Sequence, residues 1–501
     1  MAKPSFVARR NDGFGGRLSA ILNAMVLSKH CQGEFRFVWP KFPEELSFGH
    51  TVSDREHTFS REFVEKFGVE NNGSIKPDGI VGPHLNRGDI LETAFDDYSC
   101  LIVNHTPFFY SLPELHAQIP LHSFRETFDQ IKFSPALEDA RKHAGRVLME
   151  GDAVAIHLRA GDVIYGPFRK THGYVQKAIP YPMAELLIER NLGAKNTVIV
   201  FGQDDELIEY ISEKYPVISA NILKREKGFN EVQSALFDIA LMGRCEKILA
   251  GSSAFAEVAS LVSGYQRAEL RHMFSYIEIN SALDALIGQI GRTDKRISGE
   301  QISHALSYAF HFARDIREYK DWLPVLAVML EHDPGNAYHW MLKAHIHCTL
   351  GEYPTAEIAL QRHFDAVDNR HELDQMYSQI FGGGMRTIDH YLPVFRESAE
   401  LGNPNAIRCV SVAENPAAMV WNSGQARRSS VSAEPDFAAT VENTHEQTAA
   451  KQSRLTDFAG LLQNSVLASS RTGIEPAWRR VAALALKGLQ HHHRHPPDND
   501  P

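Results

Sequence analysis

Between residues 153 and 262 the sequence alternates short apolar runs with longer helical segments, and this alternation limits the folds that the chain can adopt. The runs predicted as strands are 153–158, 197–201, 217–219 and 247–250, and the predicted helices are 183–191, 205–214, 234–243 and 254–262. Strands and helices in regular alternation form parallel sheets covered by helices. The segment therefore predicts an α/β fold with a doubly wound parallel sheet.

The beginning of the chain carries a related unit. A strand at Phe6 and Val7 leads into a glycine-rich turn at 11–17, which is followed by a helix at 18–29 and a strand at 35–39. The helix has Leu18 and Ile21 on one face, as an amphipathic helix requires. This order predicts a second α/β lobe, and two such lobes in tandem favour a ligand site between them.

Composition narrows the class of protein. The 501 residues are enough for two or three domains, and 43% hydrophobic with 23% charged residues is typical of a globular chain. The net charge of -10 provides no global basic field, so we expect no nucleic-acid partner. We expect no transmembrane segment either, because no apolar run approaches the ~20 residues that span a bilayer.

Cysteine use and the first residues bear on the compartment. Five widely spaced cysteines, an odd number, predict reduced thiols, and no Cys/His spacing suggests a zinc site. We therefore expect no metal. The first ten residues lack the apolar core of a signal peptide. We expect a cytoplasmic protein, with peripheral attachment to the inner face of a membrane as a further option.

The remainder of the chain changes character. Glu318-Tyr319 recurs as Glu352-Tyr353, a period of 34 residues that resembles tetratricopeptide (TPR) repeats and predicts a helical module for a protein partner. Two units are fewer than a stable stack needs, so flanking helices such as 373–380 would complete it. From 402 the chain is rich in Ser, Ala, Glu, Gln and Thr, which predicts a low-complexity, poorly ordered tail with a terminal helix at 476–490.

These patterns divide the chain into four parts. They are an N-terminal α/β lobe at 1–140, a second α/β lobe at 141–295, helical repeats at 296–401 and the tail at 402–501.

The strongest chemical signal lies at the end of the strand at 153–158, where the chain reads His157-Leu-Arg159-Ala-Gly-Asp162. Ligands bind outside the carboxyl ends of parallel strands. An Arg at this position is a permanent cation with a planar fork, which suits a phosphate or diphosphate. The structural alternative is a strand-end salt bridge between Arg159 and a nearby carboxylate.

Three other places complete a pattern, and each has a structural alternative. Gly15, Gly16 and Arg17 open a helix, where backbone amides favour anions, although a plain tight turn has the same composition. Asp204 and Asp205 follow a strand and could contact a ligand or cap the next helix. Asp238 precedes a strand that ends in small hydroxyl residues suited to phosphate or to capping; these are Ser252 and Ser253, followed by Phe255.

The order of these motifs on successive strands resembles the fucosyltransferase superfamily, which includes α1,2-, α1,6- and protein O-fucosyltransferases. The resemblance covers residues 6–265, about half of the chain. It implies a GT-B fold of two Rossmann-type lobes and a nucleotide-sugar substrate, usually GDP-fucose, with no cofactor. The second lobe would bind the donor, and the first lobe would face a glycan, glycolipid or protein acceptor.

The resemblance also implies roles for single residues. Arg159 would hold the donor diphosphate, His157 would lie near the guanosine, and Asp238 would accept hydrogen bonds from the guanine edge. Ser252, Ser253 and the amide of Phe255 would cradle the β-phosphate. Asp204 and Asp205 match the paired acids of the family, and Gly15, Gly16 and Arg17 lie at the place of its glycine-rich N-terminal turn.

Two departures keep the donor sugar open. Relatives often have Asn where this chain has Gly16 and Arg17, and a second Arg where it has Ala160.

Catalysis would combine Arg159, which stabilises the leaving diphosphate, with a base for the acceptor hydroxyl. Asp162 and His172 are the nearest candidates for the base in sequence, and Asp162 is also placed to pin the turn. The polar and aromatic loop 163–179 is expected to face the acceptor or to be a mobile solvent loop. The sequence thus favours an inverting, metal-independent fucosyltransferase. The alternatives are a non-catalytic TPR-type interaction protein on a degenerate transferase fold and a GT-B enzyme with another nucleotide sugar.

Overall fold

The computed structural model describes residues 3–40, 52–70, 77, 79–81, 99–103, 119–120, 122–170, 172–265, 267–367 and 391–414. Its first sheet has five parallel strands in the order β3-β2-β1-β5-β4. They are β1 (Ser5–Arg9), β2 (Glu34–Val38), β3 (Gly68–Val69), β4 (Gly79–Ile80) and β5 (Cys100–Val103).

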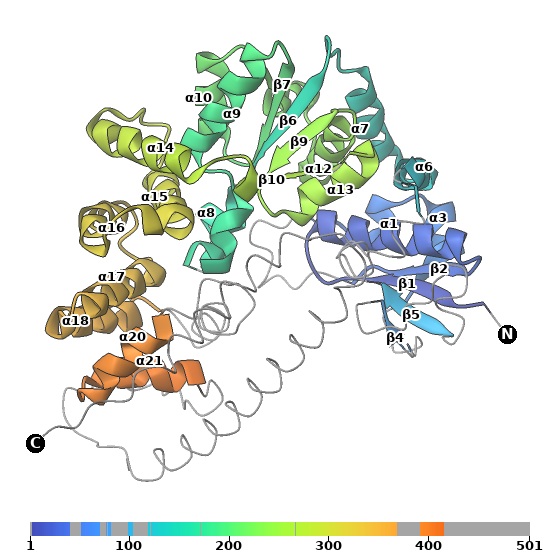
Figure 1. Ribbon diagram of the computed structural model, residues 1–501. Helices are drawn as coiled ribbons and strands as arrows, with labels where there is room; N and C mark the ends of the chain where they lie inside the picture. The colour runs from blue at the N-terminus through green and yellow to red at the C-terminus, as the bar shows by residue number, and fades with distance from the viewer. Residues whose placement is uncertain are drawn as a thin grey trace, which may run out of the picture. The chain divides into compact units, whose positions relative to one another are not determined.

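The second sheet is also parallel and five-stranded, in the order β10-β9-β6-β7-β8 (Figure 1). Its strands are β6 (Ala153–Leu158), β7 (Thr197–Gly202), β8 (Ile218–Ser219), β9 (Lys247–Ala250) and β10 (Ala268–Glu269). Two parallel sheets with helices between their strands confirm the predicted α/β fold with a pair of Rossmann-type lobes.

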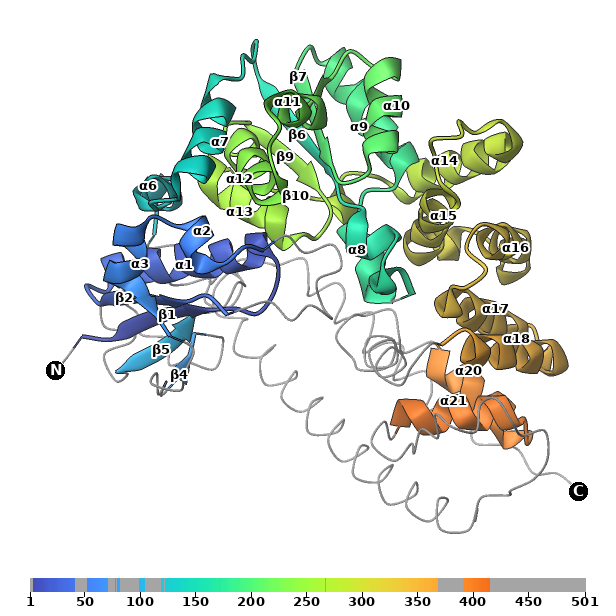
Figure 2. The same cartoon turned by 180° about the vertical axis from the view of Figure 1, so that it is seen from behind.

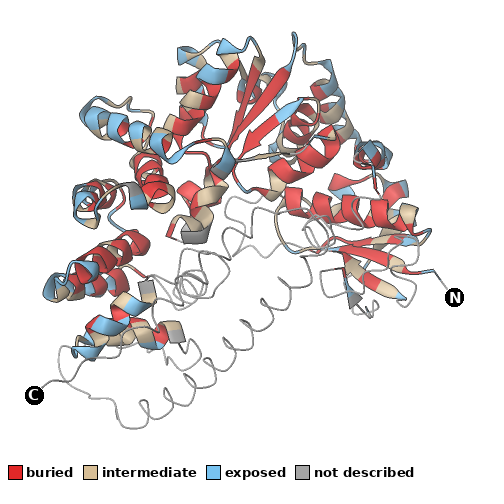
Figure 3. Ribbon diagram, viewed as in Figure 1, coloured by how far each residue is buried: buried red, intermediate tan, exposed pale blue. Residues whose placement is uncertain are grey.

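β6 is the central strand of the second sheet and explains why this lobe folds as it does. All six of its residues are buried, and the strands of this sheet are among the most buried parts of the lobe in Figure 3. Parallel sheets are covered on both faces, so their strands carry continuous apolar runs rather than alternating ones. His157 is the polar exception, and it pairs in register with Phe201 of β7 and Ala250 of β9.

Helices cover both sheets. Those of the first lobe and its connection to the second are α1 (Phe14–His30), α2 (Arg55–Thr58), α3 (Arg61–Phe67), α6 (His122–Gln130) and α7 (Pro135–Arg146). Those of the second lobe are α8 (Gly161–Ile164), α9 (Tyr181–Gly193), α10 (Asp205–Lys214), α11 (Ala220–Lys227), α12 (Glu231–Met242) and α13 (Ala254–Ser263). α7 crosses the domain boundary expected at residue 140 and packs against α12.

One hydrophobic cluster spans both lobes, while the sheet of the second lobe also has a cluster of its own. α1 lies beside α13 in both views of the molecule, and the two helices pack together (Figures 1 and 2). Val258 and Leu261 of α13 belong to the same buried cluster as Leu18 and Leu22 of α1. Apolar packing of this kind fixes the lobes against each other and brings their functional ends together.

A helical region follows, and its helices extend beyond the predicted bounds of 296–401, since α14 begins at Tyr276 and α21 ends at Glu414. Its helices are α14 (Tyr276–Gln289), α15 (Gly299–Ala313), α16 (Trp322–His332), α17 (Ala337–Thr349), α18 (Tyr353–Asp365), α20 (Tyr391–Glu400) and α21 (Pro404–Glu414). α15 packs on α16, α17 on α18 and α20 on α21. Their assignment to TPR repeats stays a prediction. The tail was expected to be poorly ordered from 402, but its first residues form α21, which packs on α20. The rest of the tail, from 415, and the expected helices 373–380 and 476–490 lie outside the described residues.

One boundary differs from the sequence prediction in a way that affects the site. The first helix was expected at 18–29 after a glycine-rich turn, whereas α1 begins at Phe14. Gly15, Gly16 and Arg17 therefore form its first turn. A Cβ atom at Gly16 would lie 2.4 Å from Oδ1 of Asp12, so the missing side chain makes room for that carboxylate. The glycines therefore allow other groups to approach the first turn of a helix closely. They do not form the loop that the sequence predicted.

Candidate active site

The strand order of the second sheet locates its ligand-binding edge. The chain runs from β6 outward through β7 to β8, then returns to the other side of β6 with β9 and β10. In open parallel sheets ligands bind outside the carboxyl ends of the strands at the point where this direction reverses. Here that point lies between the carboxyl ends of β6 and β9, the strands that precede the two strongest sequence motifs.

Arg159 follows β6 directly and pairs with Asp162 in α8. Its Nε donates to Asp162 Oδ1 at 3.1 Å and its Nη2 to Oδ2 at 2.6 Å. The Asp162 side chain is 2% exposed and that of Arg159 is 17% exposed. Nη1 of Arg159 makes no hydrogen bond within the described part of the chain. The salt-bridge alternative is therefore realised, yet it holds the guanidinium in place with one amino group still available for an anion.

Asp162 itself has little freedom for proton transfer, because both of its oxygens accept hydrogen bonds from Arg159. This geometry favours a role in orienting Arg159. Its predicted function as a general base is untested, and the side chain of the other candidate, His172, lies outside the described residues.

His157, two residues before Arg159, is a buried neutral imidazole. Its ring stacks on Phe255 at a centroid distance of 5.5 Å and an angle of 24°. Burial lowers the pKa of His157 to about 3, and the cations Arg159, Lys224 and Arg267 act in the same direction. Nδ1 has no hydrogen-bond partner among the described residues. The ring can therefore donate or accept one hydrogen bond without changing its charge.

The carboxyl end of β9 leads through Ser252 and Ser253 into α13. Ser253 is the N-cap residue, but its side chain makes no capping hydrogen bond, and its buried Oγ has no partner in the described part of the structure. Ser252 is exposed, and its amide donates to the carbonyl of Gln176 at 3.0 Å. The first-turn amides of α13 are left without a side-chain cap, which is the arrangement that binds phosphate at a helix start.

The first lobe reaches this place through Gly15. A Cβ atom at Gly15 would lie 2.8 Å from Cα of Phe255, closer than real side chains approach. The amino ends of α1 and α13 therefore meet, and the amino end of α1 also lacks a side-chain cap. Two helix starts that meet present partial positive charge from both lobes.

Arg17 is used differently from the sequence prediction. It is 2% exposed; its Nε donates to the carbonyl of Asp12 at 2.7 Å and its Nη1 to that of Pro40 at 2.5 Å. Its guanidinium also lies 5.1 Å from the ring centroid of Trp39, and burial lowers its pKa to about 10. These contacts commit the side chain to the fold of the first lobe.

The paired acids at the start of α10 also serve the fold. Asp204 caps the helix by accepting from the amide of Leu207 at 3.0 Å, as the capping alternative predicted. Its second oxygen accepts from the Tyr165 hydroxyl and, at 2.8 Å, from Nε2 of Gln301. Asp205 is exposed and accepts from Nδ2 of Asn221 at 2.7 Å. Asp204 therefore links the second lobe to α15, and a donor contact for either acid is untested.

Asp238 of α12 forms a salt bridge with Lys224 of α11 at 2.7 Å. Burial raises the pKa of Asp238, and Lys224 opposes this shift. Its Oδ1 is buried without a hydrogen-bond partner among the described residues. Because Lys224 also lowers the pKa of His157, the pair lies within electrostatic reach of that ring.

Sequence reasoning missed Lys177, the last residue of the 3-10 helix His172–Lys177. The charged groups that act on it are Arg159 and Asp162 from the second lobe and Arg10 and Asp12 from the first. Arg10 and Asp12 follow β1 and form a salt bridge of 2.8 Å. Nothing local marks Lys177, since its position depends on the packing of its backbone against β9.

The loop between α8 and Lys177 was expected to face the acceptor or the solvent. Three of its side chains instead face the helical region. Tyr165 donates to Asp204 beside Gln301, Nε of Arg169 pairs with Asp333 at 3.3 Å, and Lys170 donates to a carbonyl of α18's C-cap. These three side chains therefore do not face the solvent, because they contact α15, the helices after it or the segments that join them.

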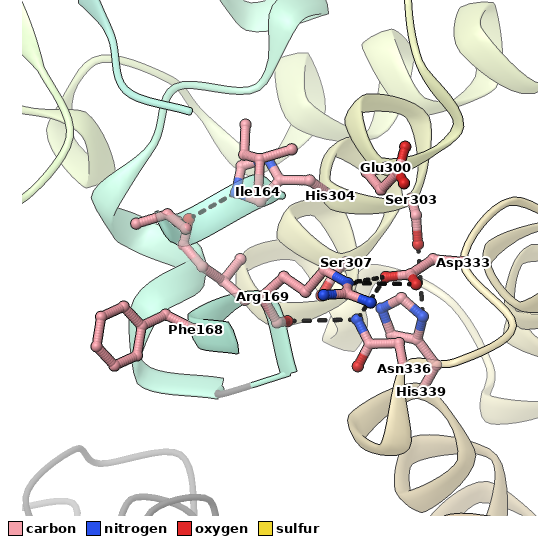
Figure 4. A pocket seen from close by; sticks show the side chains of 12 residues that line it. Ile164, Phe168, Arg169, Glu300, Ser303, His304, Ser307, Asp333, Asn336 and His339 are labelled. Carbon is pink, nitrogen blue, oxygen red and sulfur yellow. Dashed lines mark hydrogen bonds and ion pairs between the residues drawn. The ribbon is translucent and has the colours of Figure 1, made fainter. Parts of the chain in front are cut away.

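Figure 4 shows the contact surface. A small polar cavity lies where the loop meets α15–α17, and Arg169 points into it toward Asp333. Nδ2 of Asn336 donates to the carbonyl of Arg169 at 3.3 Å, and Nε2 of His304 bonds the carbonyl of Val175 at 3.1 Å. These contacts hold both halves of the loop that begins at Asp162 and ends at Lys177.

No group of three or more His, Cys, Asp or Glu side chains in the described ranges could hold a metal ion. No helix within those ranges is long and apolar enough to cross a bilayer.

Comparison with known proteins returned fucosyltransferases. No protein-family model and no curated protein sequence matches this chain. Among solved structures, the fucosyltransferase NodZ from Bradyrhizobium is similar over 52% of this chain and 94% of its own, with 16% identity and a TM-score of 0.32. POFUT1 is similar over 54% of this chain and 98% of its own, with 14% identity and a TM-score of 0.29.

Proposed function

We propose that the chain is a glycosyltransferase that takes its donor as a nucleoside-diphosphate sugar, with GDP-fucose favoured by the sequence motifs. The observation that carries the proposal is the meeting of three features at the carboxyl ends of β6 and β9. They are the available Nη1 of Arg159, the unpartnered Oγ of Ser253 and the uncapped amides of α13. A diphosphate satisfies all three, since its oxygens accept hydrogen bonds and carry negative charge.

The reaction would need little else from the protein. The acceptor oxygen attacks the anomeric carbon of the sugar, and the bond from that carbon to the β-phosphate oxygen breaks. The electron pair stays on the phosphate, where Arg159 and the α13 amides stabilise the added charge. The acceptor proton passes to a base or to water. Attack from the face opposite the diphosphate inverts the anomeric carbon, and no metal is required in this scheme.

The nucleoside side of the proposal rests on groups that the fold leaves unsatisfied. Oδ1 of Asp238 could accept from the N–H groups on the edge of a guanine, and Nδ1 of His157 could bond the ribose or the base. Unpaired buried polar atoms cost free energy, about 1–3 kcal/mol each, so a ligand that pairs them gains affinity. Phe255, stacked on His157, keeps the imidazole in one orientation.

The helical region adds a proposed role for a protein partner or an acceptor-bearing complex. Its contacts with the loop at Asp162–Lys177 connect this region to the donor end of the second lobe. The acceptor itself is proposed only by class, as a glycan, glycolipid or protein hydroxyl.

A nucleotide panel tests the proposal. Thermal unfolding is measured with GDP, UDP, CMP and GDP-fucose, and a ligand at 100 times its Kd should stabilise the protein by about 2.7 kcal/mol. Stabilisation by GDP and GDP-fucose is expected, together with slow release of GDP from GDP-fucose. Stabilisation by UDP alone would identify another nucleotide sugar. No response to any nucleotide would leave the chain as an interaction protein on a degenerate transferase fold.

A test of Arg159 as the diphosphate ligand needs a variant that still folds. Removing Arg159 alone leaves Asp162 as a buried unpaired charge, so the test uses the double variant Arg159→Met/Asp162→Asn. Its affinity for GDP should fall roughly 10- to 150-fold, the loss of a charge-assisted hydrogen bond of about 1.5–3 kcal/mol. The matched control is Arg141→Met/Glu138→Gln, which removes a pair of the same spacing on α7 with bonds of 3.0 Å. Equal GDP affinity in both double variants would reject Arg159 as the diphosphate ligand.

A further inference from the structure

Lys177 is fixed at the carboxyl end of β9 by its backbone. A Cβ atom at Gly251 would lie 2.3 Å from the Lys177 carbonyl oxygen and 2.4 Å from its carbonyl carbon, so the two backbones touch. The amide of Ser252 donates to the carbonyl of Gln176 at 3.0 Å. The residue that precedes Ser253 and the residue that precedes Lys177 are thus joined directly, which places Lys177 next to the start of α13.

The amino group of Lys177 has no carboxylate partner in the part of the chain that the structure describes. It lies 3.7 Å from the ring centroid of Tyr174, and that ring stacks on Phe168 at 4.4 Å and 4°. An aromatic face attracts an ammonium group but accepts none of its N–H bonds in the ordinary way. The side chain is therefore held in position with hydrogen-bond donors still to be used.

The charges around Lys177 favour an anion. Burial lowers the pKa of Lys177 to about 8; Arg159 and, with a smaller effect, Arg10 lower it too, while Asp162 and Asp12 raise it. Asp162 is already paired with Arg159 and Asp12 with Arg10. Lys177 is the surplus cation of this group. Two partly buried cations near each other are unfavourable, and a negative ligand between them removes that cost.

We propose that Lys177 is a second cation of the diphosphate site, acting beside Arg159 on the leaving group. The proposal rests on the proposed function and adds a residue to it. Arg159 offers a planar fork that recognises geometry, and Lys177 offers a compact charge that can follow the phosphate as it leaves. Lys177 is the last residue of the loop that contacts the helical region. It would therefore also connect that region to the donor site.

Titration calorimetry with GDP at pH 7 and pH 9 tests the assignment on the full chain. The proteins are wild type, Lys177→Arg, Lys177→Met and the control Lys247→Met, an exposed lysine at the opposite end of β9. A lysine with a pKa of about 8 is mostly charged at pH 7 and about tenfold less so at pH 9. The Kd of wild type should therefore rise about 10-fold more across this range than the Kd of Lys177→Arg.

The arms of the experiment separate the outcomes. Lys177→Met should bind GDP at least 10-fold more weakly than wild type at pH 7, and Lys247→Met should match wild type. Because all four proteins meet the same ligand, titration of GDP itself cancels in the ratios. An unchanged Kd for Lys177→Met, or equal pH slopes in wild type and Lys177→Arg, would overturn the proposal.

Inorganic pyrophosphate as a second probe distinguishes this inference from the proposed function. If pyrophosphate binds with the same dependence on Lys177 and no nucleotide binds, the nucleotide-sugar assignment fails while Lys177 stands as a diphosphate cation. If GDP binds normally to Lys177→Met, the proposed function survives and Lys177 is excluded. If neither probe binds wild type, both are overturned.

Discussion

The two α/β lobes begin with the same order of elements, but the arginine that follows the central strand has different contacts in each lobe. In each, the central strand, β1 or β6, ends in a glycine-containing turn that opens a helix. In the first lobe the arginine of that helix, Arg17, is 2% exposed and bound to two backbone carbonyls. In the second lobe Arg159 keeps one amino group available, with Ser253 and Lys177 close by. Shared topology thus supplies the location, and the greater exposure of Arg159 than of Arg17 makes the second lobe the one that can receive a ligand.

Low pH should produce the largest difference in stability between the lobes. Four histidines of the helical region have pKa values lowered to about 4 by burial, and His157 of the second lobe to about 3; the four are His304, His311, His339 and His363. The unfolded chain binds protons near pH 6.5 and the folded chain only near pH 4. Each histidine therefore removes stability as pH falls between these values, on the order of 1 kcal/mol per pH unit.

The expected result is loss of amide protection in the helical region and second lobe before the first lobe as pH drops from 6.5 to 4. Hydrogen exchange resolved by segment measures it. A variant with His304→Phe and His363→Phe should shift the transition to lower pH. Simultaneous loss of protection in all three regions at an unshifted pH would break the contrast.

Replacing Arg17 tests whether the first lobe uses its arginine for folding. Arg17→Met removes two hydrogen bonds to buried carbonyls, at Asp12 and Pro40, and should lower the free energy of unfolding by about 3 kcal/mol. Urea denaturation measures the loss, and calorimetry of the protein that remains folded should give a GDP affinity within about twofold of wild type. A larger loss of affinity would return Arg17 to the donor site.

Glycine substitution tests the junction between the lobes. Gly15→Ala places a Cβ atom 2.8 Å from the Phe255 backbone, and we expect destabilisation of about 1–3 kcal/mol together with weaker GDP binding. Gly145→Ala, in α7 with no atom within 4 Å of the new Cβ, is the control and should be neutral or stabilising by about 0.5–1 kcal/mol. Melting temperature and Kd are measured for both. Equal behaviour of the two variants would mean that the helix starts do not meet.

An exposed salt bridge of the first lobe should give the smallest effect on stability and on GDP affinity. Arg61 and Glu65 of the first lobe pair at 2.6 Å with side chains 90% and 60% exposed. Arg61→Ala should leave both the free energy of unfolding and the GDP affinity unaltered within experimental error, because solvent and salt screen an exposed pair. A measurable change in affinity would show that GDP binding responds to charge anywhere on the first lobe rather than to its site.

Local signals explain which elements could be predicted. The helix expected at 205–214 matches α10, because the capping Asp204 and the apolar spacing lie within the segment itself. The strand expected at 153–158 matches β6 for the same reason. Two-residue strands such as β3 and β4 were missed, since they exist only through pairing with distant partners. Helix α11 was missed as well, between two elements that were found.

The site residues divide in the same way, into those that local sequence marks and those that depend on distant contacts. Arg159, His157 and Ser253 lie at strand ends that the sequence marks, so their neighbourhood could be predicted. The partners of Asp204 and Arg17 could not, because Gln301 lies 97 residues from Asp204 and Pro40 lies 23 residues from Arg17. Lys177 became visible only through the backbone contact at Gly251. Motifs locate candidate groups, whereas their remaining hydrogen-bonding capacity depends on tertiary contacts.

The attachment of the loop at Asp162–Lys177 to α15 and α17 has a consequence for the whole chain. A segment held by two bodies couples their equilibria, and such coupling is reciprocal in free energy. If a partner on the helices shifts the loop and alters donor affinity by some factor, the donor must alter affinity for that partner by the same factor. A truncation that stops before α15 would also remove the partners that Asp204, Arg169 and Val175 have in the helical region. The helices are thus part of the scaffold of the second lobe rather than a detachable appendage.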